Sequence, residues 1–111
     1  MTNSMNIIEH RWGERVPVSI PVRVAAQTLV GIDGRLKNIS LSGALMRANV
    51  DLRLNAIIDI CIRLPPPASG DAVITAHVTR KVKQDVGVEW SEFAPTAVKE
   101  LLRSPSIRVP L

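Results

Sequence analysis

Val16-Pro17-Val18-Ser19-Ile20-Pro21-Val22-Arg23-Val24 is the stretch of sequence that decides the fold. Valine or isoleucine occupies every second position, and proline, serine and arginine lie between them. Because successive side chains of a β-strand point to opposite faces, this period of two predicts a strand with one buried face. The two prolines fall on the outward positions and have no N–H to donate. We therefore expect part of this strand to form a sheet edge or an irregular join.

The chain that follows carries further signals of a mainly β fold. A turn is predicted at residues 31–34, where two glycines lie close together. In the next strand, which opens at Arg35, the apolar parity shifts between Leu36 and Ile39. That shift predicts a bulge near Asn38, which would aim polar side chains off the sheet face. Further strands are predicted at residues 44–48, 56–64, 72–78 and 86–90, the last two forming a hairpin around a polar turn at residues 83–85.

One helix and two flanking segments complete the predicted organisation. Apolar residues between Ala94 and Leu102 follow helical spacing, and Pro95 suits the first turn, so we expect an amphipathic helix that plugs a barrel or covers a sheet. Residues 1–9 show no periodicity and are interpreted as a mobile leader, residues 10–103 as the domain, and residues 104–111 as a tail. Several strands before one closing helix favour an antiparallel barrel or sandwich.

Composition limits the class of protein. A chain of 111 residues fits one domain with a single core. The lone Cys61 excludes an internal disulfide framework, and its strand setting favours a buried small hydrophobic residue over a reactive thiol. A net charge of +4 suits nucleic acid, an anionic nucleotide or simple solubility. The sequence shows neither an apolar run of about 20 residues nor a signal peptide, so we expect a cytoplasmic protein without membrane insertion.

Signals of catalysis are sparse. His10 and His77 are far apart, and no spacing suggests a nucleophile with a base and an orienting group. His77 falls on the polar face of its strand, where a surface histidine is the favoured interpretation. Metal-ligand spacing is absent as well. We therefore expect a binding module rather than an enzyme, with no metal and no cofactor.

Two short motifs carry the strongest functional signal. Arg11 and Arg15 lie four residues apart just ahead of the first strand. A guanidinium is a planar, charged fork that can grip a phosphate or the O6/N7 edge of guanine, and it can stack on a purine. Downstream, Asn38, Ser40 and Gly43 offer an amide, a hydroxyl and a glycine at fixed spacing.

Together these stretches resemble the paired signatures of the PilZ family, R-x-x-x-R and D/N-x-S-x-x-G, and both signatures are complete here. The likeness extends over roughly residues 10–102. The resemblance implies a small antiparallel, six-stranded β-barrel with a C-terminal α-helix. It also implies a domain that binds the bacterial second messenger cyclic di-GMP.

The resemblance further implies a set of ligand-binding residues. Arg11 and Arg15 would hold phosphate and stack on guanine. Asn38 and Ser40 would form hydrogen bonds with one guanine or its ribose phosphate, and Gly43 would let the nucleotide lie close to the backbone. Asn38 stands where other members often have aspartate, so a charge-assisted contact is lost and a lower affinity is expected.

Several of these positions have alternative interpretations. Ser40 could instead satisfy backbone groups at the bulge, and Gly43 could serve only its turn. His10 resembles the position at which the family tunes binding of one ligand or a stacked pair. Trp12 either stacks on a guanine or covers the barrel mouth. Arg80 and Lys81 either lengthen the basic rim of the pocket or form an ordinary solvated hairpin end, whereas Trp90 ends an apolar face and is assigned to the core.

The expected function is that of a receptor and adaptor. Folding of the leader and the arginine arm over the nucleotide would order a segment and create a surface. An unidentified protein effector, or a second copy in a homo-oligomer, would then read that surface. The main alternative is a ligand-free PilZ-like module for protein–protein interaction. Nucleic-acid binding is the least favoured function, because the chain has only three aromatic residues and no aromatic stripe on any strand.

Overall fold

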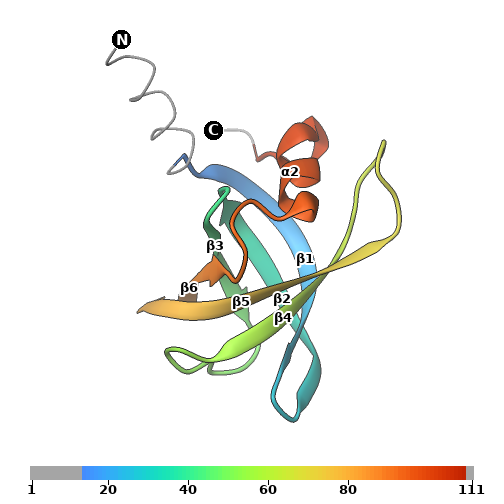
Figure 1. Cartoon of the computed structure of the whole chain (residues 1–111). Helices are drawn as coiled ribbons and strands as arrows, with labels where there is room; N and C mark the ends of the chain where they lie inside the picture. The colour runs from blue at the N-terminus through green and yellow to red at the C-terminus, as the bar shows by residue number, and fades with distance from the viewer. Residues whose placement is uncertain (1–13, 110–111) are drawn as a thin grey trace.

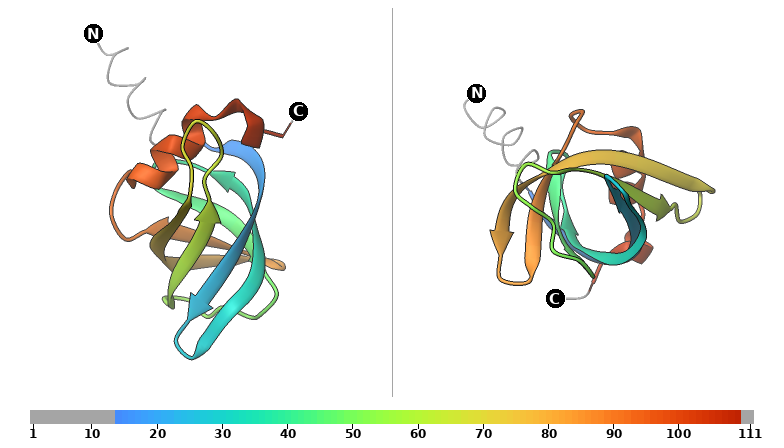
Figure 2. Two further views of the ribbon diagram at one scale, coloured as in Figure 1. Left: turned by 90° about the vertical axis from the view of Figure 1, so that its right-hand side faces the viewer. Right: turned by 90° about the horizontal axis from the view of Figure 1, so that it is seen from below.

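Six antiparallel strands form a closed barrel in the computed structural model, which describes residues 14–109. The order of strands around the barrel is β1-β2-β3-β6-β5-β4 (Figure 1). The view from below in Figure 2 shows the ring end-on. This confirms the six-stranded antiparallel barrel with one C-terminal helix. The strands are β1 (Val16–Ala26), β2 (Leu29–Ile39), β3 (Gly43–Ala48), β4 (Ile57–Arg63), β5 (Asp71–Val82) and β6 (Asp85–Trp90).

Alternate residues of the strands fill the barrel, as the period of two predicts. In β1 the inward residues Val18 to Val24 are at most 5% exposed, and their neighbours face water. Leu36, Ile39 and Met46 on β2 and β3 are fully buried. These apolar side chains form one continuous core. Removal of their surface from water contributes the largest favourable part of the free energy of folding. Trp90 is 5% exposed and belongs to this core, as expected from its place at the end of an apolar face.

The first strand has the irregular join that its prolines predict. The pairing of β1 with β2 shifts register between Pro17 and Ile20. On the other flank, β4 pairs with β1 only at residues 23–25, beyond both prolines. The positions that lack an N–H therefore lie where the ladder is incomplete, which confirms the sequence-based expectation.

The prediction of a turn at residues 31–34 is wrong. Those residues lie inside β2, and the chain reverses at Gln27 and Thr28, where Gln27 has a φ of 54°. Gly31 has a φ of 66° and lies beside a second register shift in the β1–β2 ladder, between Val24 and Ala26. Glycine here permits an irregularity within a strand, whereas the turn itself contains no glycine or proline to indicate it.

Cys61 also departs from its expected place. The thiol is free and exposed on β4. Alternation explains the difference, because Ile60 and Ile62 occupy the inward positions of this strand and Cys61 shares the outward face with Asp59 and Arg63. A strand setting by itself therefore does not decide burial, since the face has to be considered as well.

The helix α2 (Thr96–Arg103) lies at the end of the barrel opposite the β1–β2 hairpin, as Figures 1 and 2 show. It buries Val98 and Leu101 and exposes Lys99 and Arg103, which confirms the amphipathic pattern. A 3-10 turn at Pro105–Ile107 follows. The segment interpreted as a tail, residues 104–111, then returns to β1 as far as the structure describes it: Arg108 bridges to Val18, and the Val109 N–H donates to the Pro17 carbonyl at 3.2 Å.

Two isoleucines on one strand test the contribution of the barrel interior. Ile60 is fully buried, whereas Ile57 on the outer face of β4 is 67% exposed. We expect Ile60→Ala to lower the free energy of unfolding by about 2–5 kcal/mol, because it removes buried methyl groups and leaves a cavity. Ile57→Ala, the matched control, should change it by no more than about 0.5 kcal/mol. Urea unfolding of the two variants measures both values, and equal losses would contradict this assignment of faces.

Candidate functional site

A bulge in β2 presents the asparagine of the second motif. Leu36 pairs with Met46 and Asn38 pairs with Leu45, so two steps on β2 match one step on β3. This confirms the irregularity predicted from the parity of the strand. Asn38 is partly exposed, and its Oδ1 accepts a hydrogen bond from the Leu45 N–H at 3.2 Å. The side chain is thereby fixed across the bulge.

Arg15 meets Asn38 directly. Its Nη1 donates to Oδ1 of Asn38 at 2.9 Å, over a separation of 23 residues in the sequence. Partial burial of the guanidinium and, next, the positive charge of Arg80 lower the pKa of Arg15 from its usual value. Arginine nevertheless stays protonated at neutral pH. The second arginine of the R-x-x-x-R motif and the asparagine of the N-x-S-x-x-G motif therefore form one polar cluster on the surface.

Ser40 faces inward rather than toward solvent. It is 1% exposed, and its Oγ accepts hydrogen bonds from the N–H groups of Ser42 at 3.3 Å and Gly43 at 3.2 Å. The Ser40 N–H donates to the Gly43 carbonyl at 2.8 Å, which closes the turn between β2 and β3. The indole Nε1–H of Trp90 donates to the Ser40 carbonyl at 3.0 Å and ties this turn to β6. Ser40 thus satisfies backbone groups that would otherwise be buried without partners.

Gly43 lies against the neighbouring strand. A Cβ atom added at this position would be 2.0 Å from the carbonyl oxygen of Val88 on β6. Only glycine permits this approach of the two backbones, whose strands pair at Gly43 and Glu89. The glycine of the second motif is therefore required by the sheet itself.

The predicted site residues therefore differ in their location and contacts. The structure brings Arg15 and Asn38 together at the surface. It places Ser40 and Gly43 in the turn that carries this surface, where their described contacts are with the turn itself and with the backbone of β6. The predictions for His10, Arg11 and Trp12 fall outside residues 14–109.

An ion cluster beside the bulge was not predicted from the sequence. Asp85 is 8% exposed and accepts hydrogen bonds from Lys37 at 2.9 Å and from Arg47 at 2.8 Å. These contacts connect β6 to β2 and β3. In the sequence, Asp85 looks like an ordinary polar residue of a hairpin turn, and nothing marks its distant partners. The hydrogen bond from Lys37, followed by that from Arg47, holds the pKa of Asp85 below its ordinary value of 3.8 against the opposing effect of burial.

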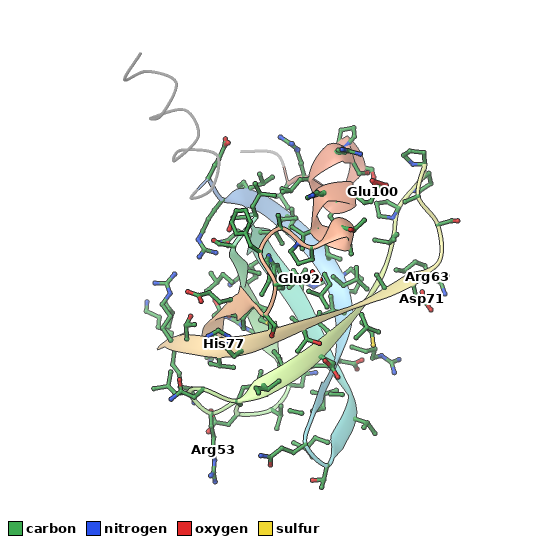
Figure 3. All side chains as sticks on the ribbon, viewed as in Figure 1. Arg53, Arg63, Asp71, His77, Glu92 and Glu100 are labelled. Atoms are coloured by element: carbon green, nitrogen blue, oxygen red, sulfur yellow. The ribbon has the colours of Figure 1, made fainter. Side chains whose placement is uncertain are left out.

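Other features of the described chain lie apart from this cluster. His77 projects from the outer side of β5 (Figure 3), with its Nε2 3.7 Å from Oε1 of Glu89, which agrees with a surface histidine. A hollow of about 610 Å³ opens where β1 and β4 separate, and its lining includes Arg23, Arg35 and Cys61 but neither Arg15 nor Asn38.

Within residues 14–109, no group of His, Cys, Asp and Glu side chains could hold a metal ion. No helix in that same part of the chain is long and apolar enough to cross a membrane.

The fold and the paired motifs define a small β-barrel binding module with one closing helix. The model of the PilZ domain family matches residues 9–104, and the chain therefore belongs to the PilZ family. Domains of this family are binding modules and in general receptors for cyclic di-GMP. No curated protein matches the sequence.

A solved structure supports the fold independently. The chain is similar to the crystal structure of the PilZ domain of CeSA from a cellulose-synthesizing bacterium, with a TM-score of 0.62 and 19% sequence identity. The alignment covers 82% of this chain and 93% of the other. At this identity the likeness establishes a shared architecture for the barrel.

The ion cluster gives a pH-dependent prediction. Because the pKa of Asp85 is lower in the folded protein than in the unfolded chain, the ionised carboxylate stabilises the fold above about pH 3.8, and this contribution is lost as the pH falls through the folded-state pKa. We expect Asp85→Asn to lower the free energy of unfolding at pH 7 by about 1–3 kcal/mol, the range for charged hydrogen bonds. The difference from wild type should shrink at pH 3.

Urea unfolding at pH 7 and pH 3 measures this difference. Asp71→Asn is the matched control, because Asp71 is 72% exposed and its nearest cation, Arg63, is 3.6 Å away. If Asp85→Asn lowers the free energy of unfolding by the same amount at both pH values, the charge of Asp85 is not what stabilises the barrel.

Proposed function

We propose that this protein is a receptor for cyclic di-GMP. The observation that carries the proposal is the 2.9 Å hydrogen bond between Arg15 and Asn38, which joins the two family signatures at one place on the surface. Membership of the PilZ family supports the same ligand. A cyclic dinucleotide presents two anionic phosphates and two guanine rings, so a site for it needs cationic forks, flat groups and neutral hydrogen-bonding groups.

The described residues supply part of this chemistry. Arg15 would bind a phosphate or stack on a guanine, because a guanidinium can do both. Asn38 uses Oδ1 to hold Arg15 and Leu45, and its amide NH₂ would donate to a guanine or to the ribose phosphate. The bulge fixes this amide in the free protein, which reduces the entropy lost on binding.

Ser40 and Gly43 contribute in the first place by shaping the turn. Their contacts with Ser42 and β6 hold the backbone beside Asn38 in one conformation. Direct contact of the ligand with Ser40 or Gly43 stays a prediction from the family signature. The same holds for Arg11 as the second cationic fork, for Trp12 as a stacking group and for His10 as the residue that tunes ligand stoichiometry.

The output would be a change in the N-terminal arm. We propose that residues 10–15 close over the nucleotide and form a surface that an unidentified protein effector, or a second copy of this chain, recognises. Arg15 is the described end of this arm, and its hydrogen bond to Asn38 supports the proposal, because it attaches that end of the arm to the barrel. With asparagine in place of aspartate at position 38, the arm is held by a neutral acceptor, which is weaker than a charged one.

Calorimetric titration with cyclic di-GMP tests the receptor proposal. We expect wild type to bind, and Arg15→Ala to bind about 10- to 100-fold more weakly, because a charge-assisted hydrogen bond is lost. Asn38→Ala should also weaken binding, since it removes both the amide donors and the acceptor that holds Arg15.

Arg63→Ala serves as the control for loss of one positive charge. Arg63 and Asp71 lie together at the end of the β4–β5 ribbon away from His77 (Figure 3), and the side chain of Arg63 is 87% exposed. The Arg63→Ala variant should bind cyclic di-GMP with the affinity of wild type. A folded wild-type protein that shows no binding would refute the receptor proposal and support the ligand-free interaction module.

Limited proteolysis tests the proposed closure of the arm. Trypsin cleaves after arginine, and Arg11 and Arg15 both lie in the arm. We expect saturating cyclic di-GMP to slow cleavage at these two positions severalfold, because a segment held against the barrel is protected. Mass spectrometry of the fragments identifies each position. Unchanged cleavage in the presence of proven binding would contradict arm closure while leaving the receptor function intact.

A further inference from the structure

We propose that Arg80 is a further guanidinium of this site, beside Arg15, and binds a phosphate of the same cyclic dinucleotide. This inference rests on the proposed function and extends it to a residue outside both family signatures. The argument uses the position of Arg80 in the sheet, the contact that orients its side chain, and the charges around it.

The sheet places Arg80 in line with Asn38. Asn38 of β2 pairs with Leu45 of β3, Leu45 pairs with Gly87 of β6, and Gly87 pairs with Arg80 of β5. The β5–β6 ladder also has a register shift, between Val78 and Arg80. Bulges therefore interrupt the ladders at both ends of this row, and each one changes the direction of the polar side chain beside it.

Gly87 gives the side chain of Arg80 its direction. A Cβ atom added at Gly87 would lie 2.8 Å from both Cγ and Nε of Arg80, so the arginine passes closely over the glycine. Gly87 is buried at this point. The hydroxyl of Thr79 donates to the Gly87 carbonyl at 3.2 Å and holds the two strands together at this point. From β5, the side chain thus extends over β6, toward β3 and the strand β2 that carries Asn38.

The charges around Arg80 and Arg15 favour an anion between them. The positive charge of Arg80 acts on Arg15. Within residues 14–109, neither guanidinium forms an ion pair with a carboxylate, whereas the adjacent Lys81 is paired with Asp51. Two like charges that act on each other, with no carboxylate of residues 14–109 paired to either, repel, and a phosphodiester bound by both would remove that repulsion. A planar fork is also well suited to two phosphate oxygens.

The test is calorimetry with cyclic di-GMP on wild type, on the Arg15→Ala variant described above and on four further variants. Arg80→Ala removes the guanidinium and should weaken binding about 10- to 100-fold. Gly87→Ala keeps the charge but pushes the Arg80 side chain from its place, so it should also weaken binding measurably. Lys81→Ala and Arg63→Ala each remove one positive charge elsewhere and should bind as wild type does. Thermal unfolding of each variant, compared with wild type, confirms that it is folded.

The outcomes separate the two proposals. Absence of binding by wild type would refute the receptor function. Binding that Arg15→Ala weakens but Arg80→Ala does not would leave the receptor function in place and overturn the role of Arg80. An equal loss in Arg80→Ala and Lys81→Ala would overturn it too, because net charge would then explain the effect. Full affinity in Gly87→Ala would overturn the position of Arg80 over the glycine as the binding geometry.

Discussion

Closure of the six-stranded sheet is the constraint on which the rest of the structure depends. A closed ring must be filled by the side chains of its inner face, and strand tilt and register must agree around the whole circumference. The buried residues of β1 to β6 meet the first condition with aliphatic side chains, a methionine and one tryptophan. The bulges of β2 and β5 meet the second, because they absorb residues that a regular ladder could not place. Polar side chains at these bulges are turned toward the outer surface.

The candidate site therefore has a supporting layer and an exposed layer. The supporting layer holds the β2–β3 turn through the hydroxyl of Ser40, the indole of Trp90 and the close contact of Gly43 with β6. Asp85 adds a charged clamp between β6 and the two strands of that turn. Arg15 and Asn38 form the exposed layer, where their side chains can meet a molecule from solution. A family signature can thus contain residues of both kinds.

Sequence alone predicted the architecture well, because period-two patterns, a polar hairpin turn and one amphipathic helix are local signals. It also located the bulge at Asn38 from a shift of parity. It failed at Gly31, since glycine permits a turn and an in-strand irregularity alike, and at Cys61, where the outward face was overlooked. It could not reveal Asp85 with its two cations or the row from Asn38 to Arg80, because those contacts depend on which strands become neighbours across the barrel. For Ser40 it left open the structural role that the described contacts show.

The return of the chain to β1 after the helix has a consequence for solubility. The part of β1 that carries Pro17 lies beyond the reach of β4, and the backbone of residues 108 and 109 bonds to it there. Exposed strand backbone is a template on which a second molecule can add a strand, and native proteins block such templates with proline or with covering segments. This barrel has both at the same place, so residues 108 and 109 cover strand backbone to which a second molecule could otherwise add a strand.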